Sequence, residues 1–525
     1  PSGGLRATAE ARGYTAWDPT SYAFVKDDTL CIPTAFCSYT GEALDKKTPL
    51  LRSMQALNKQ ALRILRLFGN TEAVRVFPTV GPEQEYFLVD KEVYRKRPDL
   101  VVTGRTLFGA KPPKGQELED HYFGVIKPRV QAFMKDLNTE LWKLGILAKT
   151  EHNEVAPAQH EMAPIFTTVN IAADHNQLTM DIMKKVADRH GMVCLLHEKP
   201  FEGVNGSGKH NNYALSTDTG VNLLDPGDTP SENAQFLVFL SAIIAAVDDY
   251  QDLMRVAVAS AGNDHRLGAN EAPPAIISMF LGDELSEILE AIADGSAYVG
   301  KEKTEMEIGV KVLPHFFRDN TDRNRTSPFA FTGNKFEFRS VGSTFSIAGP
   351  NVVLNTIVAD ELQQFADELE ASEYFPETVA KIIRRTVCEH KRILFNGNNY
   401  APEWVAEAEK RGLLNLRTTP DALPYFIRQE NIDLFTRHGV FSKTEMLSRY
   451  EILMENYAKI LHIEALTMLD MAKKDILPAA LKSAADLAGA ILEKEKAGLT
   501  AKTERALGAK ISALADSLSE RIEAL

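Results

Sequence analysis

The sequence predicts an α+β fold whose last third is helical. Residues 81–90 read Gly-Pro-Glu-Gln-Glu-Tyr-Phe-Leu-Val-Asp, and aromatic and β-branched residues after a Gly-Pro break indicate a strand with apolar side chains on both faces. Alternation over residues 335–339 predicts a second strand with three charged side chains on one face. Beyond about residue 350, apolar residues recur at three- and four-residue spacing, which is typical of amphipathic helices.

Length and composition are those of an ordinary globular protein. The 525 residues suffice for roughly two to four domains, and 44% hydrophobic and 25% charged residues are usual for this class. The net charge of −13 argues against a nucleic-acid partner or an anionic-membrane surface. No apolar run is long enough to span a bilayer, and four cysteines without metal-type spacing indicate reduced thiols. We therefore expect a cytoplasmic protein. Because it opens on Pro-Ser-Gly-Gly without an initiator Met, we also expect that part of an N-terminal region is missing.

The first part of the chain alternates between short strands, helices and turns. Residues 1–50 hold strand-like pieces at 22–25 and 29–33. A helical pattern over 49–68 ends at Gly69-Asn70, before the strand that carries two glutamates. We predict a loop over 91–115 and one long helix over 117–144, ended by Gly145. Prolines exclude a helix over 151–164, and the next helix is expected over 174–189.

The later part of the chain becomes increasingly helical. Residues 234–258 are apolar enough for a core helix, and 263–274 are predicted as a polar loop. A long amphipathic helix is expected over 444–472, and an apolar stripe over 507–525 predicts another. We expect these C-terminal helices to pack on the core or on a partner.

The glycine-rich stretch Gly203-x4-Gly208-Lys209 resembles a P-loop. A P-loop needs Ser or Thr after the Lys to hold Mg²⁺, and a helix whose N-terminus meets the phosphates. Here His210 follows the Lys, and the next two asparagines are poor helix starters. The alternatives are a turn that merely connects two elements, or a turn that presents His210 to a metal ion.

The residues that could carry chemistry are mostly carboxylates. Two glutamates side by side on a strand repel each other and are costly to bury without a compensating cation, unless the strand ends in solvent. Five carboxylates and one imidazole suit Mg²⁺ or Mn²⁺ better than zinc. Interleaved Arg and Lys residues would neutralise transferring phosphate oxygens, as two-metal phosphoryl transfer requires. The candidate metal ligands are Glu83, Glu85, Glu154, Glu161, His210 and Glu337, and the basic residues are Arg266, Arg325, Lys335 and Arg339.

Six short motifs lie in order across roughly residues 81–343. They are Gly81-x-Glu83-x-Glu85-Tyr86-Phe87, Glu154-x6-Glu161, Asn205-Gly206-Ser207-Gly208-x-His210, Arg266-x4-Glu271, Asn324-Arg325-Thr326-Ser327 and Phe336-Glu337-Phe338-Arg339. This ordered set resembles the glutamine synthetases, most closely the large type III class. Two departures from the common pattern are Asn212, where many relatives have a second His, and Lys335, where Arg is common.

The resemblance implies an architecture and an assembly. It implies a catalytic domain over residues 51–350, in which a curved antiparallel sheet is backed by helices. Residues 1–50 would be the tail of an N-terminal β domain and a linker, and residues 351–525 a helical C-terminal region. The active sites would lie between neighbouring subunits of a ring-shaped homo-oligomer, a double hexameric ring in the family.

The resemblance also implies residue roles. Glu85, Glu154 and Glu161 would hold one metal near substrate, and Glu83, His210 and Glu337 a second against the nucleotide phosphates. Asn205 and Gly206 would contact glutamate, with Arg266 and Arg339 on its carboxylates. Arg325 and Lys335 would face phosphate. Glu271 would be the flap carboxylate that closes the site and helps to deprotonate ammonium, so that Glu271, Arg325 and Arg339 form the catalytic set.

The activity that follows is the ATP-dependent ligation of ammonia to the γ-carboxyl group of L-glutamate. Two or more Mg²⁺ or Mn²⁺ ions per site would assist, and γ-glutamyl phosphate would be the intermediate. The nearest alternative is a γ-glutamyl-amine ligase that uses a larger amine. A P-loop-type ATPase or kinase and a catalytically inactive scaffold are further alternatives.

Overall fold

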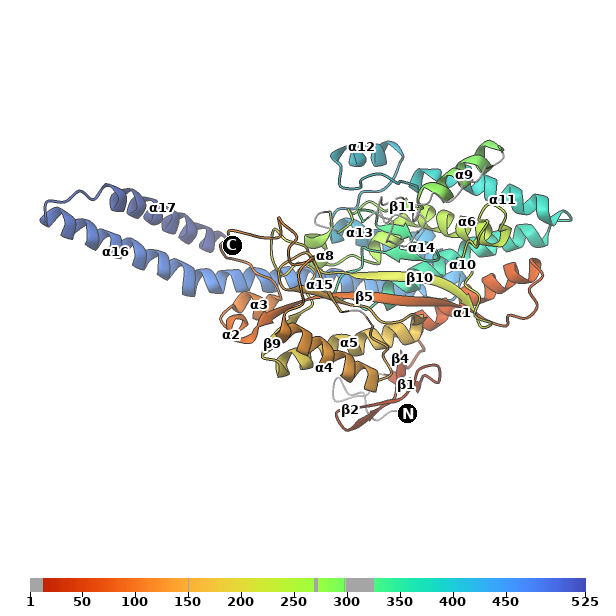
Figure 1. Cartoon of the computed structure of the whole chain (residues 1–525), viewed down its shortest axis with the longest axis horizontal. Coiled ribbons are helices and arrows are strands. Elements are labelled where there is room, and N and C mark those ends of the chain that lie inside the picture. Colours follow the sequence, from red (N-terminus) through yellow and green to blue (C-terminus); the bar gives the residue numbers. More distant parts are fainter. Residues whose placement is uncertain (1–12, 150, 269–271, 297, 299–324) are drawn as a thin grey trace, which may run out of the picture.

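The computed structural model of the chain describes residues 13–149, 151–268, 272–296, 298 and 325–525 (Figure 1). The strands are β1 (Gly13–Trp17), β2 (Phe24–Lys26), β3 (Thr29–Cys31), β4 (Thr34–Ser38), β5 (Val76–Asp90), β6 (His152–Asn153), β7 (Gln159–Met162), β8 (Thr167–Thr168), β9 (Met192–Leu195), β10 (Lys209–Thr217), β11 (Met279–Phe280), β12 (Phe329–Phe331) and β13 (Phe336–Phe338).

The helices fall between and after these strands. They are α1 (Lys47–Leu67), α2 (Lys91–Tyr94), α3 (Pro98–Thr103), α4 (Pro128–Lys143), α5 (Val169–Arg189), α6 (Ala234–Asp249), α7 (Gln251–Val256), α8 (Ala261–Arg266), α9 (Asp283–Asp294), α10 (Ala348–Glu370), α11 (Phe375–His390), α12 (Pro402–Lys410), α13 (Thr419–Phe426), α14 (Gln429–Arg437), α15 (Lys443–Met471), α16 (Leu477–Lys496) and α17 (Lys502–Ala524), with short helical turns η1 (Lys391–Ile393) and η2 (Ala472–Ile476).

A mixed sheet, nine-stranded over the described residues, forms the centre of the molecule (Figure 1). Its main path is β11-β12-β13-β10-β5-β7-β6, and β8 and β9 also pair with β5. All pairs are antiparallel except β11 with β12. Strand β5 therefore has partners along both edges, as its apolar residues on both faces predicted. The α+β class and the helix-backed sheet are confirmed.

The side chains of β5 alternate between a helix-covered face and the face that carries the glutamates. Tyr86 and Leu88 pack in one cluster with Phe133 of α4 and Met183 of α5. Glu83 and Glu85 alternate with these residues and so point to the other side of the sheet. Helices α4 and α5 thus cover the apolar face of this part of β5 and leave the carboxylates on the opposite face.

One large hydrophobic core joins the sheet to the helices that follow it. Helix α1 packs along α10, and Leu57 of α1 lies in the same buried cluster as Leu354 of α10. The cluster also includes Leu423 of α13 and Phe435 of α14. The core is continuous across residue 350, where the sequence suggested a division, and the domain limits themselves remain predictions.

The C-terminal helices leave this core gradually. Helix α15 continues through η2 into α16, and α17 folds back along α16 to form a hairpin that extends away from the sheet (Figure 1). The C-terminal part of α15 is held by Arg105, whose Nε and Nη2 donate to Glu464 Oε1 and Oε2 at 2.8 and 2.7 Å. The helices predicted over 444–472 and 507–525 are confirmed.

Two predicted helices are corrected by the structure. The helix expected over 117–144 begins only at Pro128, because proline restrains the residue before it to extended backbone and fits the first helical turn. Residues 104–127 are instead a loop with short turns. The helix expected over 234–258 is two helices, α6 and α7, that meet at Tyr250.

The P-loop alternative is wrong. Lys209 begins strand β10, so no helix N-terminus follows the glycine-rich stretch. The Lys209 side chain is fully buried and donates to the Phe345 carbonyl oxygen.

Among the described helices, none is long and apolar enough to cross a membrane. The four cysteines are free thiols: Cys31, Cys37, Cys194 and Cys388.

Candidate active site

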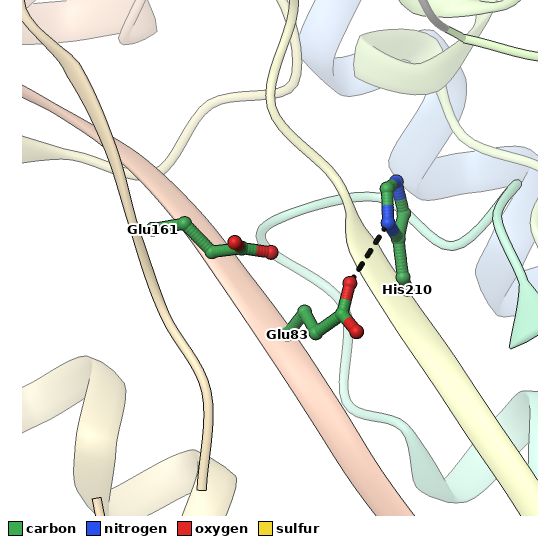
Figure 2. Close-up of side chains that lie close together, drawn as sticks. All are labelled: Glu83, Glu161 and His210. Carbon is green, nitrogen blue, oxygen red and sulfur yellow. Dashed lines mark hydrogen bonds and ion pairs between the residues drawn. The ribbon is translucent and has the colours of Figure 1, made fainter. Parts of the chain in front are cut away.

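Three side chains from three strands meet above the sheet (Figure 2). Glu83 lies on β5, Glu161 on β7 and His210 on β10, and one ligand atom from each lies within 4.8 Å of the other two. His210 and Glu83 are register partners across β5 and β10, which brings His210 Nδ1 to 3.0 Å from Glu83 Oε2. Antiparallel pairing thus joins residues that are distant in sequence.

A second group of three carboxylates shares Glu161 with the first. Glu85, Glu154 and Glu161 also offer oxygens within 4.8 Å of one another. Glu85 and Glu161 are register partners between β5 and β7. The backbone N–H of Gly208 donates to Glu85 Oε2 at 2.6 Å, which fixes the direction of this carboxylate.

Glu337 enters the site from β13. Its Oε1 lies 3.0 Å from His210 Nδ1 and 3.4 Å from Arg339 Nη1. Glu337 and Arg339 are almost fully buried. All six predicted metal ligands are therefore brought together at one place on the sheet.

The electrostatics of this cluster favour a bound cation. Burial, together with the charges of Glu83, Glu154 and Glu85, raises the pKa of Glu161 well above its ordinary value. Burial lowers the pKa of His210, yet the carboxylates of Glu337 and Glu83 outweigh this effect and raise it to about 10. The carboxylates around His210 thus favour positive charge at this place.

These donors fit divalent metal ions. Carboxylate oxygens with one imidazole suit Mg²⁺ or Mn²⁺, and a cation would relieve the repulsion that Glu161 experiences. The fit supports the predicted ligand set, whose roles remain predictions.

The Asn205-Gly206 segment lies in a tightly held turn. Gln159 Nε2 donates to the Gly206 carbonyl oxygen at 2.9 Å, and Ser207 N donates to the Glu198 carbonyl oxygen at 2.8 Å. A Cβ atom at Gly206 would overlap that Glu198 oxygen, so the close backbone approach requires glycine.

Arg266 and Arg339 lie next to each other beneath this turn. Arg266 is 2% exposed and donates to the carbonyl oxygens of Arg339 and Val341 at 3.1 and 3.4 Å. Arg339 is 4% exposed, and its Nε–H has no hydrogen-bond acceptor. A buried guanidinium N–H without an acceptor indicates a place for an anion.

The other two predicted basic residues, Arg325 and Lys335, lie over aromatic rings. The Arg325 guanidinium lies 5.9 Å from the centre of the Tyr122 ring, and Lys335 Nζ lies 5.7 Å from the centre of the Phe166 ring. Glu271, the predicted flap carboxylate, lies outside the described residues.

Further residues, to which the sequence assigned no role, contact the predicted ligands. Asn212, which stands where many relatives have a second His, donates from Nδ2 to Glu83 Oε1 at 2.9 Å. Two further residues come from the loop 104–127: His121 Nδ1 lies 2.7 Å from the Glu154 carbonyl oxygen, and Gln116 hydrogen-bonds Asn205. This loop carries no motif that could have signalled the contacts.

Comparison with known proteins agrees with this geometry. The model of the glutamine synthetase catalytic domain matches residues 61–278, that of the type III glutamine synthetase N-terminus matches 1–53, and that of the glutamine synthetase C-terminal domain matches 378–495. Glutamine synthetase of Butyrivibrio fibrisolvens is 58% identical, over 92% of this chain and 69% of the relative. Type-3 glutamine synthetase of Dictyostelium discoideum is 53% identical, over 91% of this chain and 66% of the relative.

Solved structures share the fold at lower identity. A structure titled "Apo GmaS without ligand" has a TM-score of 0.51 at 15% identity, over 86% of this chain and 82% of that chain. This likeness concerns the fold alone. The chain spans about two thirds of the length of the curated relatives named above. From the identities and the matching domain models, the chain belongs to the glutamine synthetase family, in its type III branch.

Proposed function

We propose that this protein joins ammonia to the γ-carboxyl group of L-glutamate at the expense of ATP. The γ-carboxylate oxygen attacks the γ-phosphorus of ATP and releases ADP. Ammonia then attacks the resulting acyl phosphate, and phosphate leaves with the carbon–oxygen bond electrons as glutamine forms. The observation that carries the proposal is the meeting of five carboxylates and His210 beside two buried arginines on one face of the sheet.

Two ligand groups would hold the metal ions. Glu85, Glu154 and Glu161 form one group; Glu83, Glu161 and His210 form the other, which Glu337 adjoins. Bound Mg²⁺ or Mn²⁺ would neutralise phosphate charge and so lower the barrier to phosphoryl transfer. The use of Mg²⁺ or Mn²⁺, with two or more ions per site, is part of the proposal.

The remaining residues would bind and orient the substrates. Arg339 has a buried Nε–H without an acceptor, so we assign it to an anionic oxygen of glutamate or phosphate. Asn205 and Gly206 would hold glutamate in the turn fixed by Gln159. Arg266 would add positive charge near the substrate carboxylates, and Arg325 and Lys335 would face the nucleotide phosphates.

Glu271 would complete the second step. A carboxylate on the flap would favour ammonium over a neutral amine and would take its proton before attack. Family membership supports this role for Glu271, whose position is outside the described residues.

The assembly and the location are also part of the proposal. By family membership we expect a ring-shaped homo-oligomer, a double hexameric ring, with active sites between subunits. We expect it to act in the cytoplasm, where ATP and glutamate are available. Sedimentation velocity on the purified chain tests the assembly. A monomer with full activity would contradict active sites shared between subunits.

An amine screen tests the proposed reaction. The protein is incubated with ATP, glutamate, Mg²⁺ and either ammonia or a series of larger amines, and ADP release is compared with product mass. Ammonia should be the productive amine, with one ADP per glutamine. A larger amine as the better substrate would support the rival γ-glutamyl-amine ligase, which the names of the curated relatives do not favour. No divalent-dependent ADP release would support the inactive scaffold.

A further inference from the structure

Gln116 makes a paired contact with Asn205 that no sequence motif indicates. Gln116 Nε2 donates to Asn205 Oδ1 at 2.8 Å, and the Asn205 backbone N–H donates to Gln116 Oε1 at 2.8 Å. Asn205 is only 3% exposed, so the contact lies largely away from water. One glutamine side chain therefore engages both the side-chain oxygen and the backbone of the residue assigned to glutamate binding.

The pairing determines which way the Asn205 amide faces. A side-chain amide has an acceptor oxygen on one side and a donor NH₂ group on the other. Because Gln116 occupies the oxygen with a donor, the Asn205 NH₂ group is directed to the other side. Donors are the groups that a substrate carboxylate needs, whereas an amide oxygen in that place would repel it.

Gln116 is itself held in a defined turn. Glu119 N donates to the Gln116 carbonyl oxygen at 2.9 Å, and Gly115 N donates to Glu117 Oε2 at 2.8 Å. Farther along the same loop, His121 contacts the backbone of Glu154. The loop thus reaches both the glutamate-binding turn and a metal-ligand segment, and its Gln116 side chain is preorganised.

We infer that Gln116 is a positioning residue that holds the Asn205 amide with its NH₂ group toward a carboxylate of the substrate. The inference rests on the proposed function, because it takes Asn205 to contact glutamate. It adds a residue from a loop without family motifs to the determinants of amino-acid affinity. Gln116 itself touches no reacting atom in this scheme.

A merely structural clamp makes a different prediction from an orienting one. In Gln116→Glu, the introduced carboxylate still accepts from the Asn205 backbone N–H. Its second oxygen can be satisfied only if the Asn205 amide turns over and donates its NH₂ group to it. Both hydrogen bonds then survive, but the Asn205 oxygen faces the substrate carboxylate. Gln116→Ala removes both hydrogen bonds to Asn205, so Gln116 no longer sets the orientation of the amide.

The experiment measures KM for glutamate, KM for ATP and kcat of the full chain and its variants. Gln131→Glu, which adds the same charge on the exposed face of α4, is the matched control. We expect Gln116→Glu to raise KM for glutamate by roughly tenfold or more and Gln116→Ala by only about threefold. KM for ATP should match that of the wild type and of Gln131→Glu.

Asn205→Asp provides a second test that leaves the loop unchanged. Gln116 can still donate to one oxygen of the new carboxylate, while the other oxygen replaces the NH₂ group. KM for glutamate should therefore rise at least as much as in Gln116→Glu.

Each outcome decides the inference. Gln116→Glu with a wild-type KM for glutamate, or with a smaller increase than Gln116→Ala, would overturn the orienting role and leave a clamp. An equal increase in KM for ATP would overturn it as well, because it would indicate general distortion. A wild-type chain that neither binds nor converts glutamate would overturn the proposed function, and the inference with it, and is recognised before any variant is compared.

Discussion

Glu161 is the residue whose removal should affect stability in opposite directions with and without metal. It belongs to both candidate ligand groups, and its oxygens lie within 4.8 Å of those of its carboxylate neighbours. Two unit charges at 4.8 Å repel by about 3.5 kcal/mol at an effective dielectric constant of about 20. Because Glu161 is half-buried and His210 offsets part of the repulsion, we expect Glu161→Gln to stabilise the metal-free protein by only about 1–2 kcal/mol.

The pH dependence of this effect has a defined sign. The pKa of Glu161 in the folded protein lies above its ordinary value of 4.5. Its contribution to stability is therefore fully present below pH 4.5 and is lost as the pH rises through the folded pKa. The advantage of Glu161→Gln should vanish near pH 4.5 and grow toward alkaline pH.

Metal reverses the order of the two proteins. A ligand at one hundred times its Kd stabilises the folded state by about 2.7 kcal/mol. The wild type should gain this stability with Mg²⁺, whereas Glu161→Gln, which weakens both ligand groups, should gain much less.

Thermal-shift measurements with EDTA and with saturating Mg²⁺ test this crossing. In EDTA the variant should melt on the order of 1–3 °C above the wild type, and in Mg²⁺ below it. Glu409→Gln, which removes an exposed charge from α12, is the control and should shift neither. A variant that is less stable than wild type in EDTA, or equally stabilised by Mg²⁺, would refute the reasoning.

Three further predictions concern other parts of the fold. Burial, and then the charge of Asp249, raises the pKa of Glu361 to about 8, so the wild type loses stability as the pH rises from 4.5 through about 8. In urea unfolding, Glu361→Gln should be more stable than the wild type at pH 9 and as stable as the wild type near pH 4.5. Arg105→Ala leaves Glu464 buried without its partner and should cost about 2–4 kcal/mol locally, seen as faster hydrogen exchange in α15; unchanged exchange would contradict this. The variant Lys209→Met should still bind nucleotide. If the folded variant no longer bound nucleotide, a phosphate-binding role for Lys209 would have to be reconsidered.

Strand patterns were readable from the sequence because their period is local. Alternation alone placed Glu83 and Glu85 together on one face of β5, and the structure confirms their position opposite Tyr86. Alternation also placed Glu337 and Arg339 on one face of the second strand, where they contact each other.

Convergence of the ligands could not be read from spacing. Glu161 and Glu85 meet because β5 and β7 pair in one register, and the sequence between the two strands does not predict that register. The ordered motifs of a known family supplied this information in place of physical reasoning. Where the chain has no motif, as at Gln116, the contact with a residue 89 positions away was missed.

The loop 104–127 shows why the helix prediction failed. Leu118, Phe123 and Val125 supply apolar residues where a helix was expected, but they are 73%, 78% and 90% exposed. Apolar periodicity indicates a helix only when tertiary packing buries the stripe, and Pro128 prevents the helix of α4 from extending back into this segment.

Calorimetric titration of Mg²⁺ and Mn²⁺ into the wild type, Glu85→Ala and Glu337→Ala tests the metal cluster most directly. Glu85 belongs to the group with Glu154 and Glu161, whereas Glu337 contacts His210 of the other group. The account predicts that each variant weakens metal binding, that the two affect different ions, and that activity falls with metal affinity. Wild-type metal affinity in either variant, measured on folded protein, would contradict it.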